Sequence, residues 1–261
     1  MVQDNQSILN YWDKYDIESM YDKNLLNAEI QIIKSQLQPN TKILDAGCGE
    51  GEATLAYSNV SGTTIHAADF SDVRLKKAGD RLRGSNNVLL KKVDFLGEYD
   101  LNHDYDFVIS QRFLINLMEW RLQSKVLLDF MSMLKPDGKL ILLEGSQNGV
   151  EELNNFRSIW GLEPIKVKWH NLFLDDGVLI SFMQQNGFKL TDQKGLGSYF
   201  LLTRGIKPNL DKELKWNCEF NRIAATDKIE ETLNMGIKFS RLKLWVFKKK
   251  GIDKTKSIDN L

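Results

Sequence analysis

The sequence predicts an α/β fold built around a largely parallel sheet. Short apolar runs alternate with amphipathic stretches from residue 41 onward, and a glycine-rich loop, "AGCGEG", follows the first of these runs. Alternation of strand and helix at this spacing is typical of right-handed crossovers between parallel strands. The chain has 261 residues, 42% of them hydrophobic, which is enough for one sizeable core. We therefore expect a single domain.

An N-terminal helical region precedes the alternating part of the chain. Apolar residues recur at helical spacing between Ile8 and Gln38, and the "QPNT" turn ends this region. Five strands are then predicted in KILDAG, TTIHAADF, NVLLKKVDF, YDFVIS and GKLILLEG. The helices predicted between these strands cover residues 52–57, 72–82 and 119–134.

After Gly145, the regular alternation of predicted strands and helices ends. A long irregular segment precedes the next predicted helix, 176–185, which ends at Gly187. Two last strands are expected, one within 188–203 and one over 241–247. The segment between them is polar and partly helical in pattern. In total, the pattern predicts seven strands.

Charge and composition narrow the function classes. The chain has 35 basic and 35 acidic residues, a balance that disfavours nucleic acid as an obligate partner, because phosphate binding requires a basic field. Cys48 and Cys218 are too few for a disulfide framework, which favours reduced thiols and a cytoplasmic location. The N-terminus lacks the regions of a secretion signal, and no stretch is long enough for a membrane span. Three histidines and no ligand cluster predict no metal.

The glycine loop decides between two kinds of ligand. A dinucleotide fingerprint requires G-x-G-x-x-G, whereas Gly47, Gly49 and Gly51 form G-x-G-x-G and Glu52 stands at the third fingerprint position. Asp45, just before the loop, would repel a pyrophosphate. A ligand with a cationic group at this place would not be repelled.

The stretch "LDAGCGEG" resembles the first motif of the class I S-adenosylmethionine-dependent methyltransferases, and the resemblance runs from about residue 41 to residue 144. It implies a Rossmann-like sheet of seven mostly parallel strands, with the last strand antiparallel and helices on both faces. It further implies that Asp45 holds the ammonium group of S-adenosylmethionine, next to the backbone of Gly47, Cys48, Gly49 and Gly51.

The other cofactor positions of the family can be matched one at a time. Asp69, which ends the second strand beside Phe70, matches the acid that binds both ribose hydroxyls, since a carboxylate can accept two hydrogen bonds. Asp94 and Phe95 match the residues that contact adenine. Ser110 and Gln111, at the end of the fourth strand, fall near the methionine part of the cofactor.

The resemblance also implies a lid and an acceptor side. The stretch "YWD" resembles the lead-in that covers the cofactor in this family, and Tyr11 and Tyr21 are the predicted contacts; the alternative is a core-facing helix. The acceptor-side candidates are Arg112, Trp169, Tyr199 and Arg204. Tyr199 and Arg204 are expected on a strand, where Arg204 would bind an anionic acceptor or form a surface salt bridge.

The expected domain extends over residues 1–250, with a helical lid over 1–38. Acceptor-side insertions are expected over 146–173, after strand five, and over 205–238, after strand six. Residues 251–261 are expected to form a flexible tail.

Two residues are candidates for the catalytic base. His170, in "KVKWHNLFLDD", is placed to take a proton from the acceptor, and the alternative is a structural histidine between aromatic neighbours. Glu144, which ends the fifth strand, is a second base or an anchor for the acceptor.

The sequence thus predicts methyl transfer from S-adenosylmethionine to a small or medium-sized acceptor, with O-methylation favoured. Three alternatives remain open: a non-catalytic protein that binds S-adenosylmethionine, a nicotinamide-dependent dehydrogenase and a nucleic-acid methyltransferase. Glu52 disfavours the dehydrogenase, and "SQRF" after the fourth strand, in place of an "NPPY"-like tetrad, disfavours the nucleic-acid enzyme.

Overall fold

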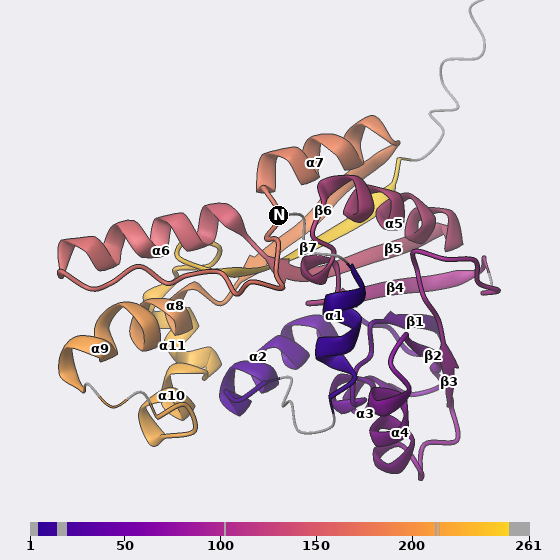
Figure 1. The fold of residues 1–261 in the computed structure, drawn as a ribbon, viewed down its shortest axis with the longest axis horizontal. Helices are drawn as coiled ribbons and strands as arrows, with labels where there is room; N and C mark the ends of the chain where they lie inside the picture. The colour runs from indigo at the N-terminus through magenta and orange to yellow at the C-terminus, as the bar shows by residue number, and fades with distance from the viewer. Residues whose placement is uncertain (1–4, 15–19, 102, 212, 214, 251–261) are drawn as a thin grey trace, which may run out of the picture.

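A seven-stranded sheet runs through the computed structural model, which describes residues 5–14, 20–101, 103–211, 213 and 215–250 (Figure 1). The strand order is β3-β2-β1-β4-β5-β7-β6. The strands are β1 Lys42–Ala46, β2 Thr64–Asp69, β3 Val88–Lys92, β4 Tyr105–Gln111, β5 Leu134–Gly145, β6 Phe188–Gly195 and β7 Leu242–Lys249.

The pairing of the strands confirms the predicted topology. β1 pairs in parallel with both β2 and β4, and β4 pairs in parallel with β5. β7 lies antiparallel between β5 and β6. Because the strand order reverses between β1 and β4, the loops after these strands diverge and leave a crevice at their carboxyl ends.

Helices cover both faces of the sheet. In Figure 1, α5 and α7 lie above the sheet, α2, α3 and α4 lie below it, and α6 with α8 to α11 forms a group at its left end. The helices are α1 Asn5–Trp12, α2 Lys23–Lys34, α3 Glu52–Ser58, α4 Asp72–Arg81, α5 Trp120–Met133, α6 Gln147–Ile159, α7 Asp176–Gln185, α8 Gly197–Phe200, α9 Lys207–Leu210, α10 Glu219–Ala224 and α11 Asp227–Leu233. A 3₁₀ turn, η1 Leu114–Asn116, and a π-helical turn, η2 Leu201–Ile206, complete the set.

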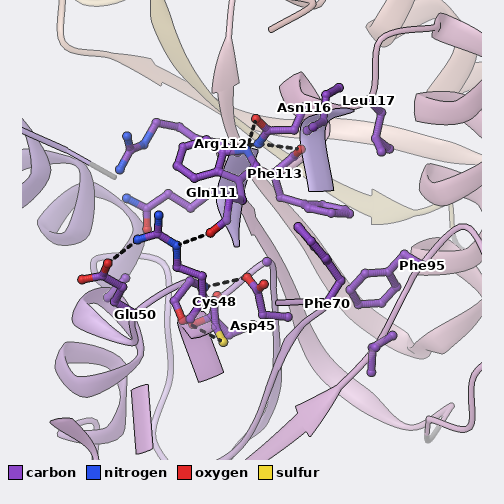
Figure 2. Close-up of a pocket in the computed structure, with 18 of the residues that line it drawn as sticks. Asp45, Cys48, Glu50, Phe70, Phe95, Gln111, Arg112, Phe113, Asn116 and Leu117 are labelled. Carbon is purple, nitrogen blue, oxygen red and sulfur yellow. Dashed lines mark hydrogen bonds and ion pairs between the residues drawn. The ribbon is translucent and has the colours of Figure 1, made fainter. Parts of the chain in front are cut away.

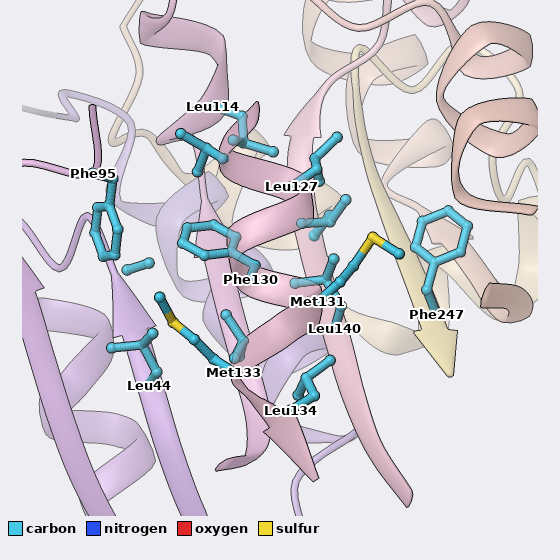
Figure 3. Close-up of a cluster of buried hydrophobic side chains, with 14 of the residues drawn as sticks. Leu44, Phe95, Leu114, Leu127, Phe130, Met131, Met133, Leu134, Leu140 and Phe247 are labelled. Atoms are coloured by element: carbon cyan, nitrogen blue, oxygen red, sulfur yellow. The ribbon is translucent and has the colours of Figure 1, made fainter. Parts of the chain in front are cut away.

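The core consists of two large apolar clusters, one on each face of the sheet. Leu140 and Leu142 of β5 pack with Phe130 of α5 on one face (Figure 3). Ile141 and Leu143 of the same strand belong to the cluster on the opposite face. Side chains alternate between faces along a strand, so β5 is buried on both sides, as expected for a central strand.

One predicted element is wrong. The stretch 198–204 was expected to be a strand, but Gly197–Phe200 is helix α8 and Leu201–Ile206 is the π-helical turn η2. The Thr203 hydroxyl donates a 2.6 Å hydrogen bond to the Tyr199 carbonyl four residues earlier, a helical contact. A short apolar run such as "SYFLL" has no periodicity that separates a strand from a buried helix.

The N-terminal region forms two helices, α1 and α2. α2 begins at Lys23 because Asp22 caps it: the Asp22 Oδ1 accepts a 3.1 Å hydrogen bond from the Leu25 amide. The predicted tail, 251–261, lies outside the described residues. Within the described part of the chain, no helix is long and apolar enough to cross a membrane.

Candidate active site at the carboxyl ends of the strands

A pocket of about 170 Å³ opens where β1, β2 and β4 end (Figure 2). Its floor is the glycine loop, and α1 and α2 contribute side chains to its walls. Two kinds of side chain characterise the lining. The carboxylates are Asp45, Glu50, Glu52, Asp69 and Asp94, and the aromatic rings are Trp12, Phe70, Phe95 and Phe113.

The glycine loop adopts a backbone that favours glycine. Gly47 and Gly49 both line the pocket, with φ angles of 75° and 54°. A Cβ atom on Gly47 would lie 2.6 Å from the Cβ of Phe113, so no side chain fits there. Cys48 also lines the pocket, and burial raises the pKa of its thiol. Gly51 lies behind the lining, where it packs against Ala78 of α4.

Asp45 is the deepest carboxylate of the pocket. Its side chain is 2% exposed, and its Oδ2 accepts a 2.6 Å hydrogen bond from the Thr54 hydroxyl. Burial raises the pKa of Asp45 to about 6, although the bond from Thr54 acts in the opposite direction. A positively charged ligand group beside Asp45 would offset the cost of keeping this carboxylate ionised.

Asp69 joins the glycine loop to the start of α4. Its Oδ2 accepts a 2.9 Å hydrogen bond from the Gly49 amide, and its Oδ1 accepts a 3.0 Å bond from the Ser71 amide. Burial raises the pKa of this carboxyl, and both backbone bonds oppose the shift. Each carboxylate oxygen can accept a second hydrogen bond, so Asp69 retains capacity for ligand hydroxyls.

Asp94 and Phe95 form the side of the pocket next to β3. Asp94 is exposed and its Oδ1 accepts a 2.9 Å hydrogen bond from the Leu96 amide, which fixes the turn. Phe95 is 3% exposed and its ring packs edge-on against Phe130, at 5.2 Å between centroids. Phe70 lines the same side. This part of the pocket therefore offers a flat apolar surface with a carboxylate beside it.

The opposite end of the pocket contains a buried polar network. Gln111, which ends β4, accepts a 3.0 Å bond from the Tyr57 hydroxyl and donates a 2.8 Å bond to Glu29 Oε2 of α2. Arg112 follows with an unusual φ of 54°, and its Nε lies 3.0 Å from the same Glu29 oxygen. Glu29 is fully buried, and burial raises the pKa of its carboxyl.

Ser110 and Glu144 do not line the pocket. The Ser110 hydroxyl donates a 2.6 Å bond to Glu144 Oε1, and the amides of Phe113 and Leu114 donate to the same oxygen at 3.1 and 3.0 Å. Glu144 is fully buried. Burial raises its pKa to about 7, and these bonds act against the shift. With its oxygens taken up by the turn after β4, Glu144 has the geometry of a structural carboxylate and not that of a base.

Helix α1 covers the pocket with Trp12, which was not among the predicted contacts. The Trp12 Nε1 donates a 3.2 Å bond to Asn116, and its ring lies 5.4 Å from the guanidinium of Arg74. The expected contacts differ: Tyr11 and Tyr21 are absent from the lining, and Tyr21 is 54% exposed. In a helix, adjacent residues face different directions, so "YWD" can place only one of its two aromatic residues over the pocket.

His170 and Trp169 belong to an aromatic group behind Trp12. His170 is 3% exposed and stacks on Tyr11 at 4.5 Å between ring centroids, and it meets Trp12 edge-on at 5.5 Å. Its Nδ1 is buried without a hydrogen-bond partner among the described residues. Burial, with a smaller contribution from the charge of Lys168, lowers the pKa of His170 to about 4. His170 does not line the pocket. Its neighbour in the chain, Trp169, is 46% exposed.

Tyr199 and Arg204 converge on Asp22 at the start of α2. The Tyr199 hydroxyl lies 2.8 and 2.7 Å from the two Asp22 oxygens, and the Arg204 Nη2 donates a 2.6 Å bond to Oδ2. Tyr199 is 2% exposed. Burial raises the pKa of its hydroxyl, and the bond to Asp22 adds to the shift. Neither residue lines the pocket, but both contact the helix that does.

Two further residues of the site were not predicted, although the sequence pattern around each of them indicates a buried charge. Glu29 lies three and four residues after Leu26 and Leu25, so a carboxylate stands on the apolar face of α2. Arg74 similarly shares the buried face of α4 with Ala78 and is 2% exposed. A charged residue on an apolar helix face is the pattern to search for, because a buried charge requires a partner.

Comparisons with known proteins agree with this geometry. The sequence model of the family described as "Methyltransferase domain" matches residues 43–138. The chain is 31% identical over 198 residues to the ubiquinone/menaquinone biosynthesis C-methyltransferase of Vibrio parahaemolyticus, covering 66% of this chain and 74% of the relative. It is 24% identical over 198 residues to the demethylmenaquinone methyltransferase of Staphylococcus carnosus, covering 72% and 80%.

The fold also matches solved structures. Phosphoethanolamine N-methyltransferase 1 of Haemonchus contortus, in complex with phosphoethanolamine and S-adenosylhomocysteine, superposes with a TM-score of 0.63 at 14% identity, over 96% of this chain and 50% of that one. With the glycine loop, the sheet order and the sequence relatives in agreement, the chain belongs to the class I S-adenosylmethionine-dependent methyltransferases and uses S-adenosylmethionine as its methyl donor.

Proposed function

We propose that this enzyme methylates a hydroxyl oxygen of a small-molecule acceptor that enters beside α1 and α2. The observation that carries the proposal is the arrangement of Asp45, Asp69 and Asp94 at the ends of three strands, beneath a tryptophan lid. Such a covered pocket suits a small acceptor, because a lid over the cofactor restricts access to the methyl group.

In this proposal, the ammonium of the cofactor lies against Asp45 and the ribose hydroxyls donate to Asp69. The adenine ring lies between Phe95 and Phe70, with its amino group toward Asp94. The pocket supports each placement: a buried carboxylate without a cation is at Asp45, free acceptor capacity is at Asp69, and flat apolar surface is at Phe95. Gly49 leaves room for the methionine part, because the space beside its Cα contains no atom within 4 Å of an added Cβ.

The methyl group leaves a sulfonium, and the leaving group is neutral, so the protein needs to align the reactants and exclude water. Gln111 and Arg112 lie at the end of the pocket where the acceptor would approach, fixed by Glu29. Trp12 excludes water from above. We propose that His170, one ring behind Trp12, holds the lid in place through its stack on Tyr11; a role as base would require the lid to move.

A second candidate is methylation of a ring carbon of a quinone-type acceptor. The observation in its favour is the similarity to the Vibrio and Staphylococcus enzymes, whose names specify ubiquinone, menaquinone and demethylmenaquinone. The two candidates share the cofactor pocket and differ only in the atom that attacks.

One experiment tests both candidates. The enzyme is incubated with S-adenosylmethionine that carries a deuterated methyl group and with a panel of hydroxylated metabolites and quinols. Mass spectrometry identifies the labelled product, and NMR distinguishes a methyl ether from a ring methyl group. A labelled methyl ether supports O-methylation. A labelled methyl group on a ring carbon contradicts O-methylation and supports the second candidate. Labelling of nucleic acid or protein alone would overturn both.

A further inference from the structure

Four cationic side chains gather beyond the methionine end of the pocket; we call Arg112, Lys168, Arg204 and Arg241 the cationic cluster. They come from four separate segments: the turn after β4, the loop after α6, η2 and the residue before β7. An apolar cluster joins α2, α6, α8 and β7. Its buried members include Leu25, Leu153, Phe200 and Leu242.

Arg204 has unused hydrogen-bonding capacity inside the protein. Its side chain is 12% exposed, its Nη2 binds Asp22, and its guanidinium carbon lies 4.0 Å from the centroid of the Trp216 ring. Its Nη1 is buried and has no hydrogen-bond partner among the described residues. Asp22 already accepts bonds from Tyr199 and Leu25, so its oxygens are shared between several donors.

Arg241 has no acidic partner at all within the described part of the chain. Its backbone carbonyl accepts a 2.9 Å bond from the Ser146 amide, which places it at the carboxyl end of β5. Its side chain is only partly exposed, and its guanidinium lies over the Phe173 ring, 5.4 Å from the centroid. A guanidinium packed against a ring keeps its N–H donors available at the edge of its plane, where they can bind an anion.

The charges of Arg204 and Arg112 act on Arg241, and those of Arg241 and Arg112 act on Lys168. Burial, together with the charges of Arg204 and Arg112, lowers the pKa of Arg241 to about 10, and the charge of Glu29 opposes this shift. Burial also lowers the pKa of Lys168, and so do Arg241 and Arg112. Glu29 and Asp22 pair with Arg112 and Arg204, so Arg241 and Lys168 remain without a carboxylate among the described residues.

Helix α2 connects the cationic cluster to the pocket. Asp22 at its start holds Arg204, Leu26 one turn later lines the pocket, and Glu29 holds Arg112, which also lines the pocket. The cluster is therefore adjacent to the place where an acceptor must lie to reach the methyl group.

We propose that the cationic cluster binds an anionic group, a carboxylate or a phosphate, of the methyl acceptor. This inference rests on the proposed function, and it specifies the substrate class. Arg241 and Arg204 would form hydrogen bonds to the anion through their guanidinium groups, with Lys168 closing the site from the solvent side. A neutral acceptor would leave Arg204 Nη1 buried without a partner, which is unfavourable, and would leave Arg241 without a counter-charge.

The test uses the full-length enzyme saturated with S-adenosylhomocysteine. Inorganic phosphate and acetate are titrated separately by calorimetry at constant ionic strength, so that the two arms distinguish a phosphate from a carboxylate. We expect at least one anion to bind, and we expect R241Q and K168Q each to weaken it by about 10-fold or more, as loss of a bond to a charged group does. K166Q and R83Q are the matched controls, since both remove an exposed positive charge outside the cluster.

Affinity for S-adenosylhomocysteine shows whether each variant is folded, and the exposed Lys168 provides a variant whose folding is not at risk. Absence of anion binding, or equal binding in all variants, overturns the inference and leaves the proposed function intact. Identification of a methylated acceptor that has no anionic group also overturns the inference and leaves the proposed function intact. Specific anion binding with no methylated small molecule in the panel contradicts the proposed function instead.

Discussion

Ionisation of the buried Asp45 is expected to destabilise the folded protein above about pH 6. Its pKa is raised by burial from 3.8 to about 6, so the folded state favours the protonated form. Proton binding by Asp45 therefore stabilises the folded state relative to the unfolded state. This contribution is complete below the ordinary pKa of an aspartate and is lost as the pH rises through 6. Each pKa unit corresponds to about 1.36 kcal/mol, so ionisation above pH 6 costs on the order of 3 kcal/mol.

We therefore expect D45N to unfold at a higher temperature than the wild type at pH 8, without ligand, and at about the same temperature at pH 4. The same variant should bind S-adenosylmethionine more weakly at pH 8, because the ammonium loses its carboxylate. Calorimetric unfolding over a pH series measures the first effect, and isothermal titration measures the second. D72N, at an exposed position, is the control. A pH-independent difference between D45N and the wild type would show that Asp45 does not titrate in this range.

Asp69 should matter for binding more than for folding. D69N keeps one oxygen for a backbone amide but loses the charge, and we expect it to weaken binding of S-adenosylhomocysteine by about 1.5–3 kcal/mol for each ribose bond affected. Titration calorimetry measures this loss. Unchanged affinity in a folded D69N variant would remove Asp69 from the ribose site.

At the residue scale, the sequence was informative wherever a side chain follows a strand. The family resemblance predicted Asp45, Asp69 and Asp94 as cofactor contacts, and all three line the pocket. Glu144 also follows a strand, yet it turns into the protein and binds the amides after β4. Position along a strand does not determine which way a side chain turns once the strand has ended, so the sequence could not separate these cases.

Among the elements, the glycine loop allows steric clash and backbone strain to be measured separately. G47A combines a φ of 75° with a Cβ contact of 2.6 Å, whereas G49A has a φ of 54° and nothing within 4 Å. A left-handed alanine costs about 1–2 kcal/mol. We expect the loss of unfolding free energy to be largest for G47A, to be near that figure for G49A and to be smallest for the control G84A, whose Cβ also meets nothing. Urea denaturation measures the series, and equal losses for G47A and G49A would contradict the clash with Phe113.

Helix α1 should control how quickly the cofactor product leaves. W12A removes the ring over the pocket and its contact with Arg74, a contact of the kind worth about 0.5–2 kcal/mol. We expect release of S-adenosylhomocysteine to become roughly 2- to 30-fold faster in stopped-flow experiments. W160A removes a tryptophan that directly follows α6 and is 57% exposed, and it serves as the control. Unaltered release from W12A would mean that α1 is not a lid.

Sequence patterns predicted helix α7 correctly but predicted a strand where α8 and η2 lie. The predicted range of α7, 176–185, agrees with the structure because Asp175 caps its start and Gly187 follows its end. The segment 198–204 gave no such signal, and its aromatic residues pack inward from a helix instead of a strand. Caps and breakers are local features, whereas the choice between a short strand and a short helix depends on the neighbours that bury it.

Ligand binding should stabilise the whole molecule, because the pocket contacts α1, α2 and the ends of four strands. At a concentration 100 times its Kd, S-adenosylhomocysteine should add about 2.7 kcal/mol, which corresponds to roughly 5–10 °C in Tm for a chain of this size. Differential scanning calorimetry measures the shift. Stabilisation by NAD in its place would contradict the cofactor assignment.

Across the whole molecule, the parallel part of the sheet followed from the alternation of apolar runs and helices, and the family resemblance added the antiparallel last strand. The arrangement of the layer around α6 and α8 to α11 did not follow. Its contacts join residues distant in sequence, such as Asp22 with Arg204 and Asn24 with the Trp216 carbonyl. Such pairs depend on which surfaces meet after folding, and a single sequence contains no record of them.

The place of β7 between β5 and β6 has a consequence for biosynthesis. Among the described strands, β6 pairs with β7 alone, so it has no partner in the sheet until β7 has left the ribosome. The segments that bear Arg204 and Lys168 are made earlier but pack against Leu242 at the start of that strand. During translation, the half of the molecule that contains the glycine loop can therefore assemble first, whereas the half proposed to select the acceptor must wait until β7 has been made.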